Sequence, residues 1–145
     1  MKILLVGNYG PDNQASMRAF LRALERELPT LGCELRVITP PQRVQRLPPA
    51  SRFWKWLGYI DKFILFIPSL AVQARWADVV HICDHSNSMY VRWVNSRPTV
   101  ITCHDVIAVQ AARGMVDGWN VGWSGRIFQR LIASGLAKAD LIACV

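Results

Sequence analysis

The chain has 145 residues, of which 52% are hydrophobic and 19% charged, so it can form the core of one globular domain. This composition excludes an intrinsically disordered chain. The formal net charge of +7 attracts phosphates, nucleic acid or anionic lipid, and charge alone does not choose among them.

Two features of the chain bear on its location. The apolar run at the start, KILLVG, is too short for a secretory signal and is followed at once by a turn. The cysteines are too widely spaced for a zinc or redox motif, and their apolar surroundings favour buried, reduced thiols. They are Cys33, Cys83, Cys103 and Cys144. A cytoplasmic location is therefore expected.

The N-terminal segment predicts a strand, a turn and a helix. Residues 2–7 form a continuous apolar run, and residues 8–13 are dense in turn formers. Leucines and a phenylalanine at spacings of three and four predict a helix over about residues 14–31. Asp12 or Asn13 is expected to cap its start, and the proline in its last turn places its end earlier.

The middle of the chain predicts two further strands around a long helical region. Residues 34–39 are the second strand, and the Pro-, Gln- and Arg-rich residues 40–52 predict a loop. A helix is expected over about residues 53–77, broken near Pro68 because proline cannot continue the hydrogen-bond ladder. Residues 78–83 are the third strand.

The C-terminal part completes an alternating pattern. Residues 99–103 and 140–145 predict strands, and residues 126–138 predict the helix between them. Short apolar strands that alternate with helices predict an α/β fold, a Rossmann-like parallel sheet with helices on both faces.

Polar side chains gather in loops that follow the predicted strands. The loops are residues 7–14, 39–43, 84–88 and 103–107, at the carboxyl ends of parallel strands, where such sheets bind ligands. Their histidine, carboxylate, hydroxyl and amide groups predict a shared site, and ordinary polar loop chemistry is the alternative. The residues are Asn8, Asn13, Asp84, His85, Ser86, Asn87, His104 and Asp105.

Four stretches, taken in order, resemble the N-terminal domain of family 4 glycosyltransferases. They are KILLVGNYGPDNQASMRAFLRAL, ADVVHICDHSN, TVITCHDV and LAKADLIACV. The resemblance implies that residues 1–145 are the acceptor-side lobe of a retaining enzyme with the two-lobed GT-B architecture. The family's second lobe carries two glutamates eight positions apart, and no two glutamates here have that spacing. We therefore expect that the nucleotide-sugar lobe is absent from this chain, and that the chain alone is inactive.

The resemblance also implies a reaction and a set of site residues. A hexosyltransferase-like enzyme would move a sugar from a nucleotide sugar to a glycan or lipid-linked acceptor, with retention. Helix termini and basic side chains would neutralise the diphosphate, so neither a cofactor nor a metal is expected. His104 is the candidate catalytic residue, and Asp105 would fix the local backbone or the imidazole. The candidate acceptor-binding residues are Asn8, Gly10, Asn13, His85, Ser86 and Asn87.

A zinc site is a rival interpretation of the same region. His81, Cys83 and His85 alternate, so on a strand they would share a face, with Cys103 or His104 nearby. The apolar strand that carries them favours core packing instead.

The segment RFWKWLGYIDKFILFI, residues 52–67, is aromatic, basic and amphipathic. Its longest apolar run begins after Lys62 and, counted on to Val72, is about ten residues, shorter than the ~20 that span a bilayer. It predicts either a helix packed on the sheet or a surface that lies on a membrane, with anionic lipid attracted through residues 43–67. The basic residues concerned are Arg43, Arg46, Arg52 and Lys55. On the second reading the protein is peripheral at the inner face of the membrane.

Other functions remain as alternatives. A non-catalytic, membrane-associated binding subunit or a split-enzyme partner would use the same fold without turnover by this chain. A Rossmann oxidoreductase is disfavoured, because Gly7-Asn8-Tyr9-Gly10 does not supply the glycine fingerprint. Scattered Arg and Lys residues without a recognisable motif also disfavour nucleic-acid binding.

Overall fold

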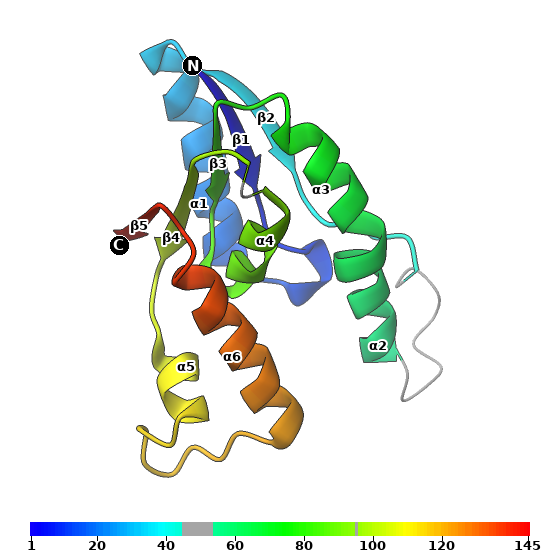
Figure 1. The fold of residues 1–145 in the computed structure, drawn as a ribbon, viewed down its shortest axis with the longest axis vertical. Coiled ribbons are helices and arrows are strands. Elements are labelled where there is room, and N and C mark those ends of the chain that lie inside the picture. Colours follow the sequence, from blue (N-terminus) through cyan, green and yellow to red (C-terminus); the bar gives the residue numbers. More distant parts are fainter. Residues whose placement is uncertain (45–53, 95) are drawn as a thin grey trace.

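A computed structural model describes residues 1–44, 54–94 and 96–145, except for the side chains of residues 54–56. Its centre is a parallel sheet of five strands in the order β2-β1-β3-β4-β5 (Figure 1). All five strands that the sequence predicts are confirmed, and the α/β Rossmann-like class with them. They are β1 (Lys2–Val6), β2 (Glu34–Ile38), β3 (Val79–Ile82), β4 (Thr99–Cys103) and β5 (Leu141–Cys144).

The first connection differs from expectation at the start of its helix. After β1, the 3-10 turn η1 (Gly10–Asp12) precedes α1 (Ala15–Glu27). The predicted caps, Asp12 and Asn13, are wrong, because the N-cap is Gln14 and its side chain makes no capping bond. Asp12 instead pairs with Lys62 at 2.6 Å, and Asn13 adopts the left-handed conformation, φ 51°. The early helix end is confirmed, since the 3-10 turn η2 (Leu28–Leu31) replaces the last α-turn.

The predicted break at Pro68 is wrong. The helical region is continuous, running through α2 (Trp54–Tyr59), the π-helix η3 (Ile60–Leu65) and α3 (Phe66–Ala74). In the π-helix, the Phe66 amide bonds the carbonyl of Asp61, five residues back. The wider π-turn lies directly ahead of the proline, where the i−4 carbonyl would otherwise meet its ring.

The uninterrupted helix also changes the estimate of its apolar length. Residues Leu57–Ala74 form a stretch of 18 residues that is long and apolar enough to cross a membrane by length and composition alone. The ten-residue count from the sequence covered only the part of this stretch between Lys62 and Val72. Because core helices of soluble proteins pass the same test, this is weak evidence. Phe66, Leu70 and Ala74 are buried, whereas Ile64 and Val72 are each 63% exposed.

Three α-helices follow β3 in the described part of the chain, and two of them were not predicted. The unpredicted helices are α4 (Val91–Val94), which continues the 3-10 helix η4 (His85–Tyr90), and α5 (Ile107–Ala112). The third is α6 (Trp123–Leu136), which begins three residues before its predicted start.

The helices cover both faces of the sheet. Figure 1 shows α1 behind the sheet and α4 in front of it. Leu21 of α1 packs with Ile3 and Leu5 of β1 on one face. On the other face, residues of α3, α4 and α6 pack with β1, β3 and β4 around the buried Phe66 and Tyr90.

Two glycines permit close approach where the fold needs it. A Cβ on Gly7, just after β1, would lie 2.6 Å from Leu21 Cδ2, so glycine lets α1 pack against the end of the strand. A Cβ on Gly135 of α6 would overlap the backbone of Ser88 in η4. The Ser88 hydroxyl donates to the Ile132 carbonyl at 2.7 Å, which fixes the same contact.

Candidate functional site

A buried polar cluster lies beyond the carboxyl ends of β1 and β3. Asp84, 2% exposed, accepts hydrogen bonds from Asn8 Nδ2 at 2.5 Å and from the Ser86 hydroxyl at 2.6 Å. Asn87 Nδ2 donates to Asn8 Oδ1 at 3.0 Å. Because a buried carboxylate is costly unless hydrogen-bonded, these partners account for its place in the fold. The cluster joins the first loop to η4.

The η4 helix begins at this carboxylate. Asp84 is its N-cap and accepts from the Ser86 amide at 3.0 Å. The buried Nδ1 of His85 lies 3.2 Å from Asp84 Oδ1 but makes no hydrogen bond within the described part of the chain. The His85 ring is therefore held directly beside the Asp84 carboxylate.

His104 follows the last residue of β4 and is partly buried. Its ring stands edge-on against Phe20 of α1, with 5.2 Å between ring centroids. Its Nε2 lies 3.3 Å from the carbonyl oxygen of Cys83. A carbonyl oxygen only accepts, so this bond requires the proton on Nε2 and leaves Nδ1 for another partner. The contacts with Phe20 of α1 and with Cys83, which follows β3, set the plane of the imidazole.

Asp105 acts on the backbone. Its Oδ1 accepts from the Ile107 amide at 3.1 Å, which fixes the turn into α5. Of the two roles expected for this residue, the structure shows the backbone contact. No hydrogen bond joins it to the His104 ring among the described residues.

These groups surround a hollow of about 330 Å³, within the size range of small-molecule sites. Its walls come from the start of α1, η4, the end of β4, α5 and α6. His104 and the end of the 8–14 turn therefore lie on the same side of the molecule. The lining residues are Gln14, Ser16, Met17, Asp84, His85, Ser86, His104, Asp105, Ala108, Phe128, Gln129 and Ile132.

A second buried carboxylate braces the first loop from the other side. Asp61 of the π-helix is fully buried and accepts from the Tyr9 hydroxyl at 2.7 Å. It also accepts from the backbone amides of Arg43 and Val44, at 3.3 and 3.0 Å. Burial and the nearby carboxylate raise the pKa of Tyr9 well above its usual value. The first and second strand-end loops are thus fixed to the same helix.

The sequence profile of Glycosyltransferase Family 4 matches residues 17–145. The chain belongs to glycosyltransferase family 4. No curated protein and no solved structure matches it. The resemblance expected from the four sequence stretches is therefore confirmed over most of the chain, and the hollow can be considered as part of a sugar-transferring enzyme's domain.

The glycosyltransferase domain brings some of the predicted site residues together and separates others. His85, Ser86, His104 and Asp105 line the hollow. Asn8 and Asn87 lie beneath it in the Asp84 cluster, each 8% exposed. Gly10 and Asn13 are not among its lining residues. Gly10 starts η1, and Asn13 Oδ1 accepts from Arg18 at 3.0 Å. The functional roles of all these residues remain predictions.

Sequence reasoning missed the walls contributed by helices. Gln14, Ser16 and Met17 stand at the beginning of α1, and Asn8 Nδ2 donates to Gln14 Oε1. Phe128 and Gln129 come from α6, which follows β4 by some twenty residues. The helix start was a readable signal, because it follows the first strand-end loop directly. The α6 contribution depends on tertiary packing.

The structure does not support the zinc interpretation among the described residues. His81 Nε2 lies 2.8 Å from the Thr102 hydroxyl on the neighbouring strand, and burial lowers the pKa of His81 to about 4. Burial raises the pKa of Cys83 to about 12, which keeps its thiol protonated. No three His, Cys, Asp or Glu side chains within the described ranges could hold a metal ion together.

Proposed function

We propose that this domain is the acceptor-side half of a retaining glycosyltransferase that moves a sugar from a nucleotide sugar to a glycan or lipid-linked acceptor. The observation that carries the proposal is that His104 and the start of α1 line one hollow beyond the carboxyl ends of the strands. Family membership supplies the reaction class. The nucleotide-sugar lobe would face this edge of the sheet.

In the proposed reaction, the main task of the first lobe is to position the acceptor and His104 at the reacting sugar. The bond between the anomeric carbon and the diphosphate breaks, and the diphosphate leaves with the electron pair. The oxygen of an acceptor hydroxyl forms the new bond to the anomeric carbon, and its proton passes to the departing diphosphate. With Nε2 held by the Cys83 carbonyl, His104 presents Nδ1 to the reacting sugar. His85 and Ser86 would orient the acceptor. We propose that neither a metal nor a cofactor takes part, because basic groups and helix termini neutralise the diphosphate.

A membrane-facing role is part of the proposal. Ile64 and Val72 are exposed on a helix whose other face is buried, so packing on the sheet and contact with lipid are compatible. Of the basic residues expected to attract lipid, Arg46 and Arg52 lie outside the described residues, and the side chain of Lys55 does too. We propose a cytoplasmic protein, peripheral at the inner membrane face.

The test is reconstitution with a nucleotide-sugar lobe, supplied in cis or in trans, followed by measurement of sugar transfer. His104→Ala should cut turnover by roughly a hundredfold or more, the scale of a lost positioned catalytic group. Its circular dichroism and melting temperature should stay close to those of the parent. Unchanged turnover would remove His104 from the mechanism.

The non-catalytic alternative predicts a different result in the same experiment. A binding subunit would retain the acceptor, yet no lobe would restore turnover, with or without His104. Titration of the lone domain with a nucleotide sugar is the companion measurement, because an acceptor-side lobe should bind the nucleotide weakly.

A further inference from the structure

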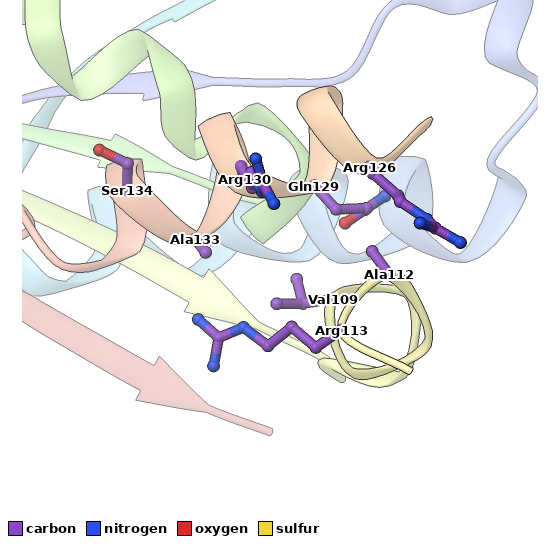
Figure 2. Close-up of a pocket in the computed structure, with 8 residues that line it drawn as sticks. All are labelled: Val109, Ala112, Arg113, Arg126, Gln129, Arg130, Ala133 and Ser134. Atoms are coloured by element: carbon purple, nitrogen blue, oxygen red, sulfur yellow. The ribbon is translucent and has the colours of Figure 1, made fainter. Parts of the chain in front are cut away.

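A second hollow lies between α5 and α6. It measures about 600 Å³ and is separate from the hollow that contains His104. Figure 2 shows it with Arg113 and Arg126 at opposite ends and small apolar side chains between them. Its lining residues are Val109, Ala112, Arg113, Arg126, Gln129, Arg130, Ala133 and Ser134.

Helical spacing explains why these residues share one hollow. On α6 the lining positions follow one another at alternating intervals of three and one, so they form a single stripe along the helix. Val109 and Ala112 of α5, and Arg113 at its C-cap, have the same spacing. Alanine at positions 112 and 133 leaves space that a larger side chain would fill. The hollow therefore follows from the sequences of the two facing helices.

The charges in this hollow are of one sign. Three of the eight lining residues are arginines and none is acidic. Among the described residues, no carboxylate pairs with Arg113, Arg126 or Arg130. Arg126 Nε donates to the Val121 carbonyl at 3.0 Å, which anchors that side chain without neutralising it. On the rim, Arg92 donates to the Ser134 hydroxyl at 2.8 Å and adds a fourth positive charge.

We infer that the pocket between α5 and α6 binds a phosphate group. Guanidinium groups bind phosphate through paired, charge-assisted hydrogen bonds, and several of them around one hollow favour a multiply charged anion. A volume of about 600 Å³ lies within the range of small-molecule sites, so a diphosphate or a phosphorylated sugar fits. Bound phosphate would also relieve the repulsion among the arginines.

The position of the pocket suggests which molecule carries the phosphate. Gln129 lines both this pocket and the hollow around His104. The α5 helix begins at Ile107, two residues after Asp105, whose carboxylate accepts from the Ile107 amide. A molecule in the His104 hollow could therefore extend a phosphate into the arginine pocket. The phosphate then belongs to the acceptor, and this last step rests on the proposed function.

The binding test uses the 145-residue chain with inorganic pyrophosphate and inorganic phosphate as probes. Each probe is titrated into the chain by isothermal titration calorimetry at constant ionic strength, with sodium chloride as the reference salt. We expect one pyrophosphate to bind per chain. The double variant Arg113→Gln, Arg130→Gln should weaken binding roughly tenfold or more, because two charge-assisted contacts are lost. Arg126 is left in place because it also bonds the backbone.

A charge-matched control separates this pocket from general attraction to a basic surface. Arg22→Gln with Arg75→Gln removes two exposed arginines elsewhere on the molecule. This control should change the affinity less than about twofold, as expected for screened surface charges. An equal loss in both double variants would overturn the inference, and so would a lack of binding by every probe, vesicles included.

A vesicle arm identifies the source of the phosphate. Sedimentation with phosphatidylcholine vesicles is compared with vesicles that also contain phosphatidylglycerol. If the parent chain binds the anionic vesicles and the pocket variant does not, the phosphate belongs to a lipid headgroup. Pyrophosphate binding without such vesicle binding assigns it to a soluble molecule.

The pocket and the transferase proposal fail independently. His104→Ala should leave pyrophosphate binding unchanged while it lowers sugar transfer. If the arginine variant loses pyrophosphate binding but retains sugar transfer, the pocket is a phosphate site, but its phosphate does not belong to the acceptor.

Discussion

The hydroxyl of Tyr9 donates a 2.7 Å hydrogen bond to Asp61, which lies 52 residues later and has no exposed surface. The bond joins the loop after the first strand to the middle of a long helix. A buried charge keeps its place only where donors surround it. This pair therefore contributes to holding the loop beside the candidate site.

Replacing Tyr9 with phenylalanine should lower the free energy of unfolding by about 1–3 kcal/mol, because a buried carboxylate loses a donor. Urea unfolding followed by circular dichroism measures the change. Tyr90→Phe is the matched control, since its hydroxyl only meets the Lys62 carbonyl at 3.3 Å. This control should lower the free energy of unfolding by less, about 0.5–1 kcal/mol. Equal losses would show that Asp61 does not depend on Tyr9.

The histidine in the sheet should make the domain acid-sensitive. Burial holds the pKa of His81 at about 4 in the folded chain, below the ~6.5 of an exposed histidine. Between these values the unfolded chain binds the extra proton, so stability falls as pH drops from about 6.5 towards 4. The loss is on the order of 2–3 kcal/mol for this mostly buried ring.

Denaturant unfolding at pH 7 and pH 4.5, for the parent and for His81→Gln, isolates this histidine. The variant should show a smaller drop between the two pH values, because glutamine does not titrate. An identical drop in both proteins would assign the acid sensitivity to other groups.

Gly135→Ala should destabilise the fold by about 1–3 kcal/mol, since the added methyl group meets the Ser88 carbonyl rather than a movable side chain. Thermal unfolding measures it. Gly125→Ala in the same helix is the control, because its methyl group meets only a Val121 side-chain carbon, at 2.8 Å. Alanine there gains helix propensity, which offsets part of the cost of moving the Val121 side chain, so the control should lose less stability than Gly135→Ala. Equal destabilisation by the two substitutions would contradict the close contact.

Two substitutions of Asp105 test whether its backbone hydrogen bond or its negative charge matters. Asp105→Asn retains an oxygen that can accept from the Ile107 amide, whereas Asp105→Ala removes it. With a second lobe present, asparagine should retain most of the transfer activity, and alanine should lose tenfold or more as α5 shifts. An inactive asparagine variant would instead mean that the negative charge itself is required.

Ile64→Ser with Val72→Ser should weaken association with phospholipid vesicles by roughly tenfold, since two exposed apolar side chains are removed from the helix. Co-sedimentation measures it. Leu31→Ser is the control, because Leu31 is 75% exposed but lies in η2, away from this helix. Vesicle binding that survives the double substitution would place lipid contact elsewhere.

The sequence predicted the sheet better than the site. Short apolar runs rich in β-branched residues, such as residues 99–103, favour buried strands, and the structure has β4 with the same bounds. The loop order then placed His85 and His104 at one edge. Residues 85–94 were missed, because buried Ser88 and Asn87 interrupt any apolar period and are stabilised by tertiary hydrogen bonds.

The helical walls of the site were hidden for a related reason. Phe128 and Gln129 reach the hollow only because α6 is held close to η4 through Gly135. Such a contact joins segments some fifty residues apart and leaves no local pattern. Family membership was readable from the four motifs, since they are strand ends with characteristic polar residues.

The π-helix of residues 60–65 has a consequence for how this segment tolerates change. A π-turn contains one residue more than an α-turn over a similar span, so the two flanking helices are offset by about 100° around their axis. Deleting one residue there would cancel the offset and turn Asp61 away from Tyr9, or Leu70 away from the sheet. The segment can therefore accept new side chains on its outer face, but its length is fixed to the residue.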